Sequence, residues 1–141
     1  MNKLTFWCLL LSLFALAQCR QPPDEKALRA TIDAMQSAAE ARDAGAFMEH
    51  VASDYSSARE PNNRIFLERY LRMMMLQQQS IGVTRTRTEI TLYSGRATAR
   101  VAFIVTGTNG SLFPERIDGV TADTGWRIEG GEWKLLSADW Q

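Results

Sequence analysis

Cysteine and histidine are both scarce in this sequence. Its 141 residues include two cysteines, Cys8 and Cys19, and one histidine, His50. A single histidine without cysteines beside it supplies no zinc ligand set, so we expect no metal site and no other cofactor. The sequence also lacks a glycine-rich phosphate loop and a Gly-x-Ser-x-Gly nucleophile elbow. No established catalytic motif is therefore present.

The chain has no excess of charge of either sign. Lysine and arginine total 16, and aspartate and glutamate also total 16. Removal of residues 1–18, in which Lys3 is the one charged residue, leaves 15 against 16 and a net charge of −1. A nucleic-acid-binding domain carries a basic surface, so this balance argues against nucleic acid as a partner.

The apolar run near the N-terminus is too short to cross a membrane. Residues 4–17 carry no charge and follow Lys3. A membrane-spanning helix needs about 20 apolar residues, whereas the core of a secretory signal has about 7–15. The run ends in Leu16-Ala17-Gln18-Cys19. This tetrapeptide resembles the bacterial lipoprotein box, although Gln18 stands where Gly, Ala or Ser is usual.

The resemblance to the lipoprotein box implies cleavage before Cys19 and a lipid on that residue. Residues 1–18 would then be the signal peptide, 19–23 a lipidated tether and 24–141 the folded domain. Arg20 replaces the aspartate that retains such proteins in the inner membrane, so we expect an outer-membrane lipoprotein of a bacterial envelope, facing the periplasm. The alternative is an ordinary signal peptide that contains a cysteine. In either case the domain has no cysteine for a disulfide or a thiol nucleophile.

The first half of the domain has helical periodicity. A first helix is predicted from Asp24 to about Arg42, because apolar residues recur with the spacing of one helix face. These residues are Leu28, Ile32, Met35 and Ala39. Asp43 is expected to cap a second, short helix that carries Phe47 and Val51 one turn apart. Pro61-Asn62-Asn63 is expected to break the chain and cap a third helix over about 64–79, whose inner stripe is Phe66, Tyr70 and Met73 or Met74.

From Ile81 onward the periodicity changes from helical to alternating. Ser94-Gly95 and Gly130-Gly131 each have the composition of a two-residue hairpin turn. These turns place Glu89 opposite Arg100 and Tyr93 opposite Arg96 in the first hairpin. In the second hairpin they place Trp126 opposite Leu135 and Ile128 opposite Trp133.

This register also predicts the two faces of the hairpins. Thr84, Thr86 and Thr88 are expected on the apolar face of the first hairpin, and Arg85 and Arg87 on the opposite face. Asp139 is expected to continue the apolar face of the last strand. Helices followed by long antiparallel strands predict an α+β domain. We expect three N-terminal helices on a curved antiparallel sheet of about four long strands plus one short strand.

Two segments carry a resemblance to a known superfamily. They are "ALRATIDAMQSAAEARDAGAFMEHVASDY" at residues 27–55 and "GWRIEGGEWKLLSADW" at residues 125–140. With the order of elements, they resemble the nuclear transport factor 2-like superfamily, which includes ketosteroid isomerase and SnoaL-like cyclases. The resemblance implies a cone-shaped, cystatin-like fold with a pocket between helices and sheet. It does not imply one activity, since the superfamily includes enzymes, binding subunits and proteins without a known role.

A pocket of this kind would be mainly apolar. The residues expected to line it are Leu28, Ile32, Met35, Phe47, Val51, Phe66, Tyr70, Phe103, Trp126 and Trp133. Its first helix lacks the tyrosine that a ketosteroid isomerase uses as an oxyanion donor. Glu60, before Pro61, falls near the position of that enzyme's base, with Glu for Asp and one extra residue. A solvated turn residue is the alternative reading of Glu60.

Four other residues are weak candidates for catalysis. Asp139 at a pocket mouth would be partly desolvated and suited to act as a base, and the alternative is a strand-end carboxylate bonded to backbone or to an arginine. Histidine is a common general acid or base, but no partner for His50 is evident. Asp54 and Tyr55 lie in an acidic loop of a kind that recurs in superfamily members without known activity.

Three functions remain open on the sequence. The first is an anchored, non-catalytic module that binds a small apolar ligand or an envelope protein. The second is a pocket enzyme, such as an isomerase, dehydratase or hydrolase, that uses Asp139 or His50. The third is an accessory subunit that forms a homodimer through its sheet. The first is favoured, because the predicted pocket stripe is apolar and has no convergent acid–base pair.

Overall fold

The computed structural model describes residues 24–58, 63–108 and 115–141. The predicted signal peptide, Cys19 with its tether, and the candidate Glu60 lie outside the described residues. None of the helices in the described ranges has the length and apolar character needed to span a membrane.

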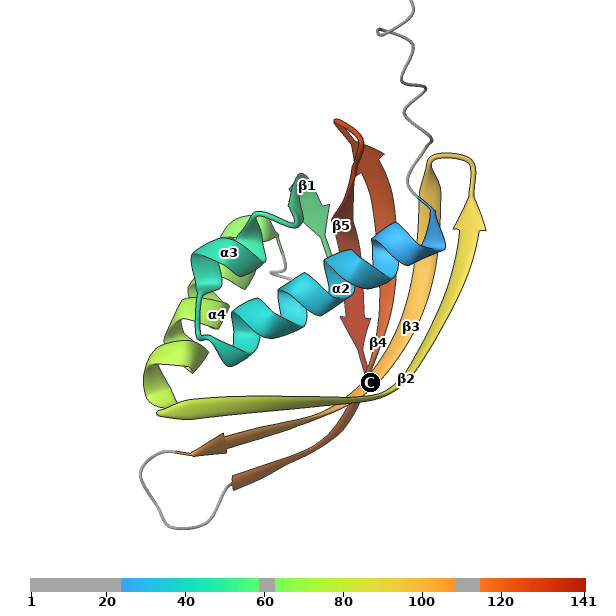
Figure 1. Ribbon diagram of the computed structural model, residues 1–141. Coiled ribbons are helices and arrows are strands. Elements are labelled where there is room, and N and C mark those ends of the chain that lie inside the picture. The colour runs from blue at the N-terminus through green and yellow to red at the C-terminus, as the bar shows by residue number, and fades with distance from the viewer. Residues whose placement is uncertain (1–23, 59–62, 109–114) are drawn as a thin grey trace, which may run out of the picture.

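The described part of the chain is an α+β domain, as predicted (Figure 1). Its elements are α2 (Glu25–Glu40), α3 (Ala44–Met48), β1 (Val51–Ser56), α4 (Arg64–Gln77), β2 (Ser80–Tyr93), β3 (Arg96–Thr108), β4 (Glu115–Glu129) and β5 (Glu132–Trp140). The strands form one five-stranded sheet in the order β1-β5-β4-β3-β2. Strands β2 to β5 pair antiparallel, and the short β1 pairs parallel to β5.

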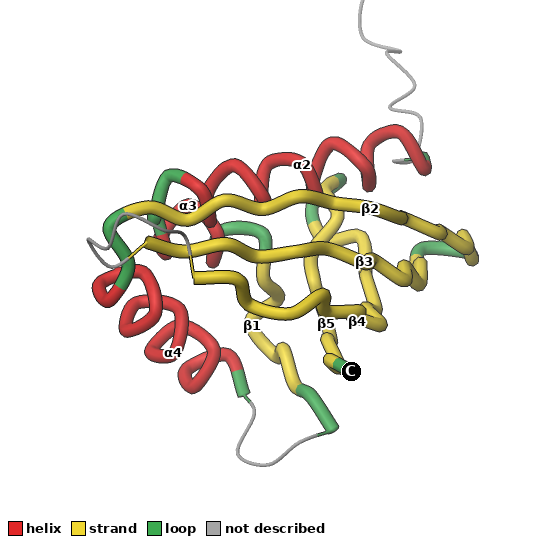
Figure 2. Tube along the Cα trace, turned by 90° about the horizontal axis from the view of Figure 1, so that it is seen from below, coloured by secondary structure: helices red, strands yellow, loops and turns green. Residues whose placement is uncertain are grey.

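The sheet is strongly curved, and the helices lie on its concave side (Figure 1). Helix α2 runs along β2, whereas α4 lies near β1 (Figure 2). The edge strand β2 is covered by α2, because Gln36 Nε2 donates to the Val83 carbonyl oxygen at 2.9 Å and Glu40 Oε1 accepts from the Val83 N–H at 3.1 Å. These contacts satisfy backbone groups of an edge strand that would otherwise be unpaired.

Each described helix begins with a polar capping residue, and two of these residues, Asp43 and Asn63, lie where the sequence predicted a cap. The side chain of Asp24 accepts a hydrogen bond from the Ala27 N–H at 2.9 Å. Asp43 accepts from the Ala46 N–H at 2.9 Å, and Asn63 accepts from the Phe66 N–H at 3.0 Å. Such bonds satisfy N–H groups that lack a partner in the first helical turn.

The second helix is shorter than predicted. Helix α3 ends at Met48, and Val51 is the first residue of β1, where it lies opposite Leu135. His50 is therefore not helical: its carbonyl oxygen accepts from the Leu135 N–H at 2.8 Å, at the point where the chain enters the sheet. Pairing of β1 with β5 is thus favoured over extension of α3 by one more turn.

Helix α4 buries a different stripe from the predicted one. Leu67 and Met75 are its buried residues. Phe66 and Tyr70 remain 43% and 47% exposed, and Met73 is also exposed. The helix is thus rotated so that its predicted inner stripe lies at the border between the core and solvent.

Both hairpin turns set the register that was predicted. Glu89 pairs with Arg100, and Trp126 pairs with Leu135. Although they are opposite each other, Glu89 and Arg100 form no ion pair among the described contacts, because the Arg100 guanidinium binds Asp123 of β4, with Nε to Oδ1 at 2.7 Å. The strand register determines which residues are neighbours. The Arg100 guanidinium then binds the neighbouring carboxylate with which it has the better hydrogen-bond geometry.

Candidate functional site

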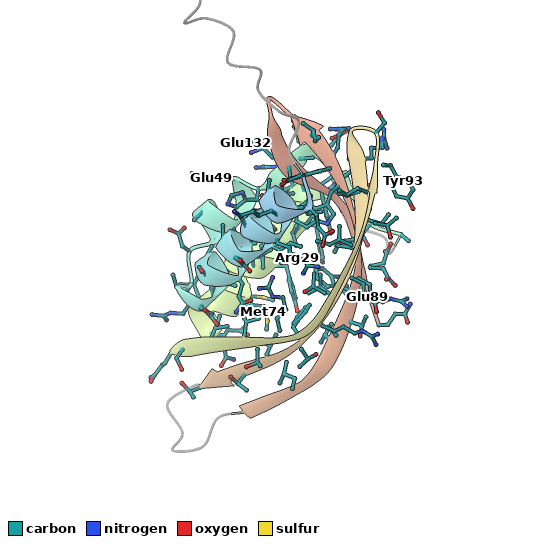
Figure 3. The ribbon with its side chains drawn as sticks, turned by 45° about the vertical axis from the view of Figure 1, so that its right-hand side comes forward. Arg29, Glu49, Met74, Glu89, Tyr93 and Glu132 are labelled. Carbon is teal, nitrogen blue, oxygen red and sulfur yellow. The ribbon has the colours of Figure 1, made fainter. Side chains whose placement is uncertain are left out.

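A pocket of about 580 Å³ lies between the three described helices and the concave face of the sheet. Ligand pockets in proteins generally have about 300–1,000 Å³ and a mainly apolar lining with a few polar groups. Helices α2 and α4 supply one wall, with Met74 of α4 labelled in Figure 3. Residues of β2 to β5, among them Phe103 and Trp126, supply the opposite wall.

Most of the residues predicted to line a pocket lie around this one. Seven of the ten predicted residues line the pocket, namely Ile32, Met35, Phe47, Phe66, Tyr70, Phe103 and Trp126. Leu28, Val51 and Trp133 do not line it; they are core residues with exposures of 0%, 5% and 2%. The open part of the domain thus lies toward α4 and the ends of the long strands, away from the start of α2.

Several lining residues were not predicted. They are chiefly Gln36, Gln78, Arg85, Ala138 and Trp140. Gln36 lies one turn after Ile32 on α2, so helical spacing contained a signal for it. Arg85 and Trp140 had no such signal, because a bulge in each strand changes the face to which they belong.

The first bulge lies at Thr86 of β2. Arg85 pairs with Phe103 and Arg87 pairs with Ala102, so Thr86 is the extra residue. The prediction that Thr84 and Thr86 belong to the apolar face is wrong, since both are exposed. Arg85 lines the pocket instead, and its guanidinium forms an ion pair with Asp33 of α2.

The second bulge lies at Leu136 of β5. Trp126 pairs with Leu135 and Gly125 pairs with Ser137, so Leu136 is the extra residue. Ala138 and Trp140 therefore line the pocket, and the expected place of Asp139 on the apolar face is wrong. Alternation along a strand is reversed after a one-residue bulge, which sends Asp139 to the opposite face.

Asp139 binds the segment that follows β1. Its Oδ1 accepts from the Ser57 hydroxyl at 3.0 Å and from the Ala58 N–H at 3.0 Å. This is the strand-end, backbone-bonded carboxylate that the sequence left open as the alternative to a base.

Asp54 and His50 also lie away from the pocket lining. Asp54 is exposed on β1 and receives two hydrogen bonds from Arg127 of β4, at 2.7 and 3.1 Å. These hydrogen bonds lower the pKa of the Asp54 carboxyl below its ordinary value. The structure therefore does not bring His50, Asp54 and Asp139 together in the pocket.

Tyr55 is a buried residue of β1 with an unusual environment. Its side chain is 2% exposed, and its hydroxyl has no hydrogen-bond partner within the described residues. Burial, with a smaller contribution from the charge of Asp139, raises the pKa of Tyr55 to about 12. A buried hydroxyl without a partner contributes no hydrogen-bond energy to the fold.

Replacing Tyr55 with phenylalanine should remove a pH dependence without weakening the fold at neutral pH. Tyrosine ionises near pH 10 in the unfolded chain and near 12 here, so its contribution is complete below pH 10 and is lost as the pH rises to 12. Denaturant unfolding at pH 8 and pH 12 should show the wild type losing about 2–3 kcal/mol more than the variant. A variant destabilised by more than about 1 kcal/mol at pH 8 would indicate a hydroxyl partner.

Comparison with known proteins finds similarity of fold. No protein-family model matches the sequence, and no curated protein matches it significantly. A nuclear transport factor 2-like protein with a cystatin-like fold from Novosphingobium aromaticivorans has a TM-score of 0.68 at 18% identity, over 99% of this chain and 90% of that one. A nuclear transport factor 2-like protein of unknown function from Pseudomonas putida has a TM-score of 0.70 at 17% identity, over 83% and 84%.

A third similar structure comes from Streptomyces avermitilis. It belongs to the nuclear transport factor 2-like family, and dehydratase activity has been suggested for it. Its TM-score is 0.69 at 16% identity, over 82% of this chain and 92% of that one. Identities at this level show a shared fold and carry no activity with them. The chain therefore has the cystatin-like, nuclear transport factor 2-like fold that the resemblance in its sequence implied.

Proposed function

We propose that this domain binds a small, neutral, mainly apolar molecule in its pocket and does not transform it. The observation that supports this proposal is the pocket of about 580 Å³ with a lining dominated by apolar and aromatic side chains. Burial of apolar ligand surface contributes about 25 cal/mol per Å², so such a lining favours apolar ligands.

The aromatic side chains favour a ligand that contains a ring. They come from several different elements and are Phe47, Phe66, Tyr70, Phe103, Trp126 and Trp140. Aromatic rings prefer offset-stacked or edge-to-face contacts with other rings, which adds to the energy of burial. A flat bicyclic molecule is therefore a suitable probe.

The placement of titratable groups favours binding over catalysis. Within the described residues, the titratable side chains that line the pocket are Tyr70 and Arg85. Tyr70 is 47% exposed, and Arg85 is paired with Asp33. General acid–base chemistry needs a group within hydrogen-bond reach of the substrate and a pKa suited to the proton transfer. A dehydratase-type enzyme is the second candidate, supported by the similarity in fold to the Streptomyces avermitilis protein.

We also propose that Cys19 anchors the domain to a bacterial membrane through a lipid. This proposal depends on the sequence "LAQC" at residues 16–19 after an uncharged apolar run. Together the two proposals describe a pocket held at the envelope, with the outer membrane as the expected site. Its ligand would reach it from the periplasm or from the membrane.

Calorimetric titration of the purified protein with 2-naphthol tests the binding proposal. We expect one saturable site per chain and a negative heat-capacity change, which is the robust sign of apolar burial. Binding heats that do not saturate would contradict a defined pocket.

A further inference from the structure

The start of α2 and the turns of both hairpins lie at one end of the domain (Figure 1). The indole N–H of Trp133, close to the β4–β5 turn, donates to the Asp24 carbonyl oxygen at 3.2 Å. The Ile128 N–H, on the other side of that turn, donates to the Gly95 carbonyl oxygen of the β2–β3 turn at 3.1 Å. The chain therefore enters the described domain at the end that carries both turns.

Large apolar side chains are exposed in two places within the described residues. One group lies along α4, and the other is Leu92 and Tyr93, which are 43% and 60% exposed. These two residues directly precede Ser94-Gly95, the turn between β2 and β3. Tyr93 projects outward from the sheet (Figure 3). The fold thus leaves an adjacent leucine and tyrosine uncovered at the tip of a hairpin.

The proposed lipid anchor keeps this end of the domain close to a membrane. Asp24 is the fifth residue after Cys19, and five residues span at most about 18 Å when fully extended. Helix α2, with 16 residues, is longer than this at about 24 Å. Helix α4 ends at Gln77, before the start of β2, whereas the exposed pair lies at the other end of that strand. The tether therefore brings the hairpin turn, and not the end of α4, near the lipid.

The charges at this end suit a surface of lipid headgroups. Glu25 is paired with Arg29 at 2.8 Å, and Glu132 is paired with Lys134 at 3.3 Å. Arg96, across the β2–β3 turn, is exposed and belongs to none of the ion pairs of the described residues. Its guanidinium can bind a phosphate group through two N–H groups. A tyrosine ring beside it fits the same level, because tyrosine is enriched where apolar and aqueous regions of a membrane meet.

We propose that the β2–β3 turn inserts Leu92 and Tyr93 into the surface of the membrane that holds Cys19. This inference rests on the proposed lipid anchor. Insertion is favourable because it removes the apolar surface of both side chains from water, and the short tether keeps the lipid at a high effective concentration. The open part of the pocket lies toward α4, at the opposite end of the domain. In this orientation a ligand enters the pocket from the aqueous side and not from the membrane.

Fluorescent labels at the two ends of the domain test the contact. Cys8 lies in the proposed signal peptide and Cys19 carries the lipid, so a cysteine introduced at Ser94 or at Gln77 is the one free thiol for a nitrobenzoxadiazole label. Both positions are exposed. The full chain is produced in a bacterium, and the mature lipoprotein is placed in phosphatidylethanolamine and phosphatidylglycerol vesicles that contain a nitroxide lipid. The nitroxide should quench the label of Ser94→Cys at least about twofold more than that of Gln77→Cys.

Two pairs of substitutions show whether the exposed side chains cause the contact. Leu92→Ser combined with Tyr93→Ser should lower the quenching at position 94 to the level at position 77. Ile65→Ser combined with Leu76→Ser is the matched control, because these residues of α4 are also exposed, at 60% and 85%. The control should leave the quenching at position 94 unchanged.

Mass spectrometry of the mature chain reports the anchor separately from the contact. A lipidated chain without quenching at position 94, or with stronger quenching at position 77, would overturn the inference and leave the anchor standing. A blue-shifted label at position 94 without quenching would show that a protein, such as a second copy of the chain, covers the turn, and this result would also overturn it. A mature chain without lipid on Cys19 would refute the anchor and the inference together.

Discussion

Replacing Trp133 with alanine should lower the free energy of unfolding by about 3–5 kcal/mol. Trp133 is 2% exposed and is one of the two largest fully buried side chains of the described residues. Its indole N–H donates to the Asp24 carbonyl oxygen at 3.2 Å, which joins β5 to the start of α2. The variant loses this bond and leaves a cavity at the centre of the core. Denaturant unfolding monitored by circular dichroism measures the loss.

Trp140→Ala is the control for that experiment. Trp140 is on the same strand, but it is half-buried and lines the pocket, where water can occupy the space left by its ring. We expect the free energy of unfolding to fall by about 1–2 kcal/mol, because this substitution removes less buried surface. If Trp133→Ala lowers the free energy of unfolding by no more than Trp140→Ala does, the distinction between core and pocket is contradicted.

Replacing Val105 with tryptophan should weaken the binding of 2-naphthol by at least about a hundredfold. Val105 lines the pocket from β3, opposite Val83. An indole in its place would occupy the volume that a bicyclic ligand needs, and overlap with a ligand cannot be relieved in a packed site. Calorimetric titration of the variant measures the effect, with its melting temperature as evidence that it is folded.

Ile104→Trp is the matched control for this blocking experiment. Ile104 is the neighbouring residue on β3 and does not line the pocket; its partner on β2 is Thr84, which is exposed. The same side chain is thereby placed on the other face of the same strand. Affinity should remain within about threefold of the wild type. Equal losses in both variants would locate binding elsewhere or show a general effect on the sheet.

The local features of the fold were predictable from the sequence. Helix caps such as Asp43 and Asn63, and turns such as Gly130-Gly131, act through the backbone within a few residues. Turn position then determines hairpin register, so the pairing of Trp126 with Leu135 could be predicted without the rest of the chain. The end of α3 could not be predicted in this way, because it depends on pairing between β1 and β5, which are distant in sequence.

The composition of the pocket was predictable only in part, because bulges determine it. One extra residue at Thr86 or Leu136 leaves the alternation of residue types intact and reverses the face of the residues that lie beyond the bulge, counted from the hairpin turn. Arg85 is thereby brought into the pocket, and Asp139 is removed from it. The rotation of α4 has a similar effect on Phe66 and Tyr70, since helical spacing defines a stripe without saying how deeply it is buried.

The most direct test of pocket binding is to locate bound 2-naphthol by nuclear Overhauser contacts between its ring protons and side-chain methyl groups. We predict contacts to Met74 and Val101, which line the pocket from α4 and β3. Ile65 and Leu76 of α4 are 60% and 85% exposed, do not line the pocket and should show none. Contacts to Ile65 or Leu76 without contacts to Met74 or Val101 would place the probe on the outer surface and contradict the account.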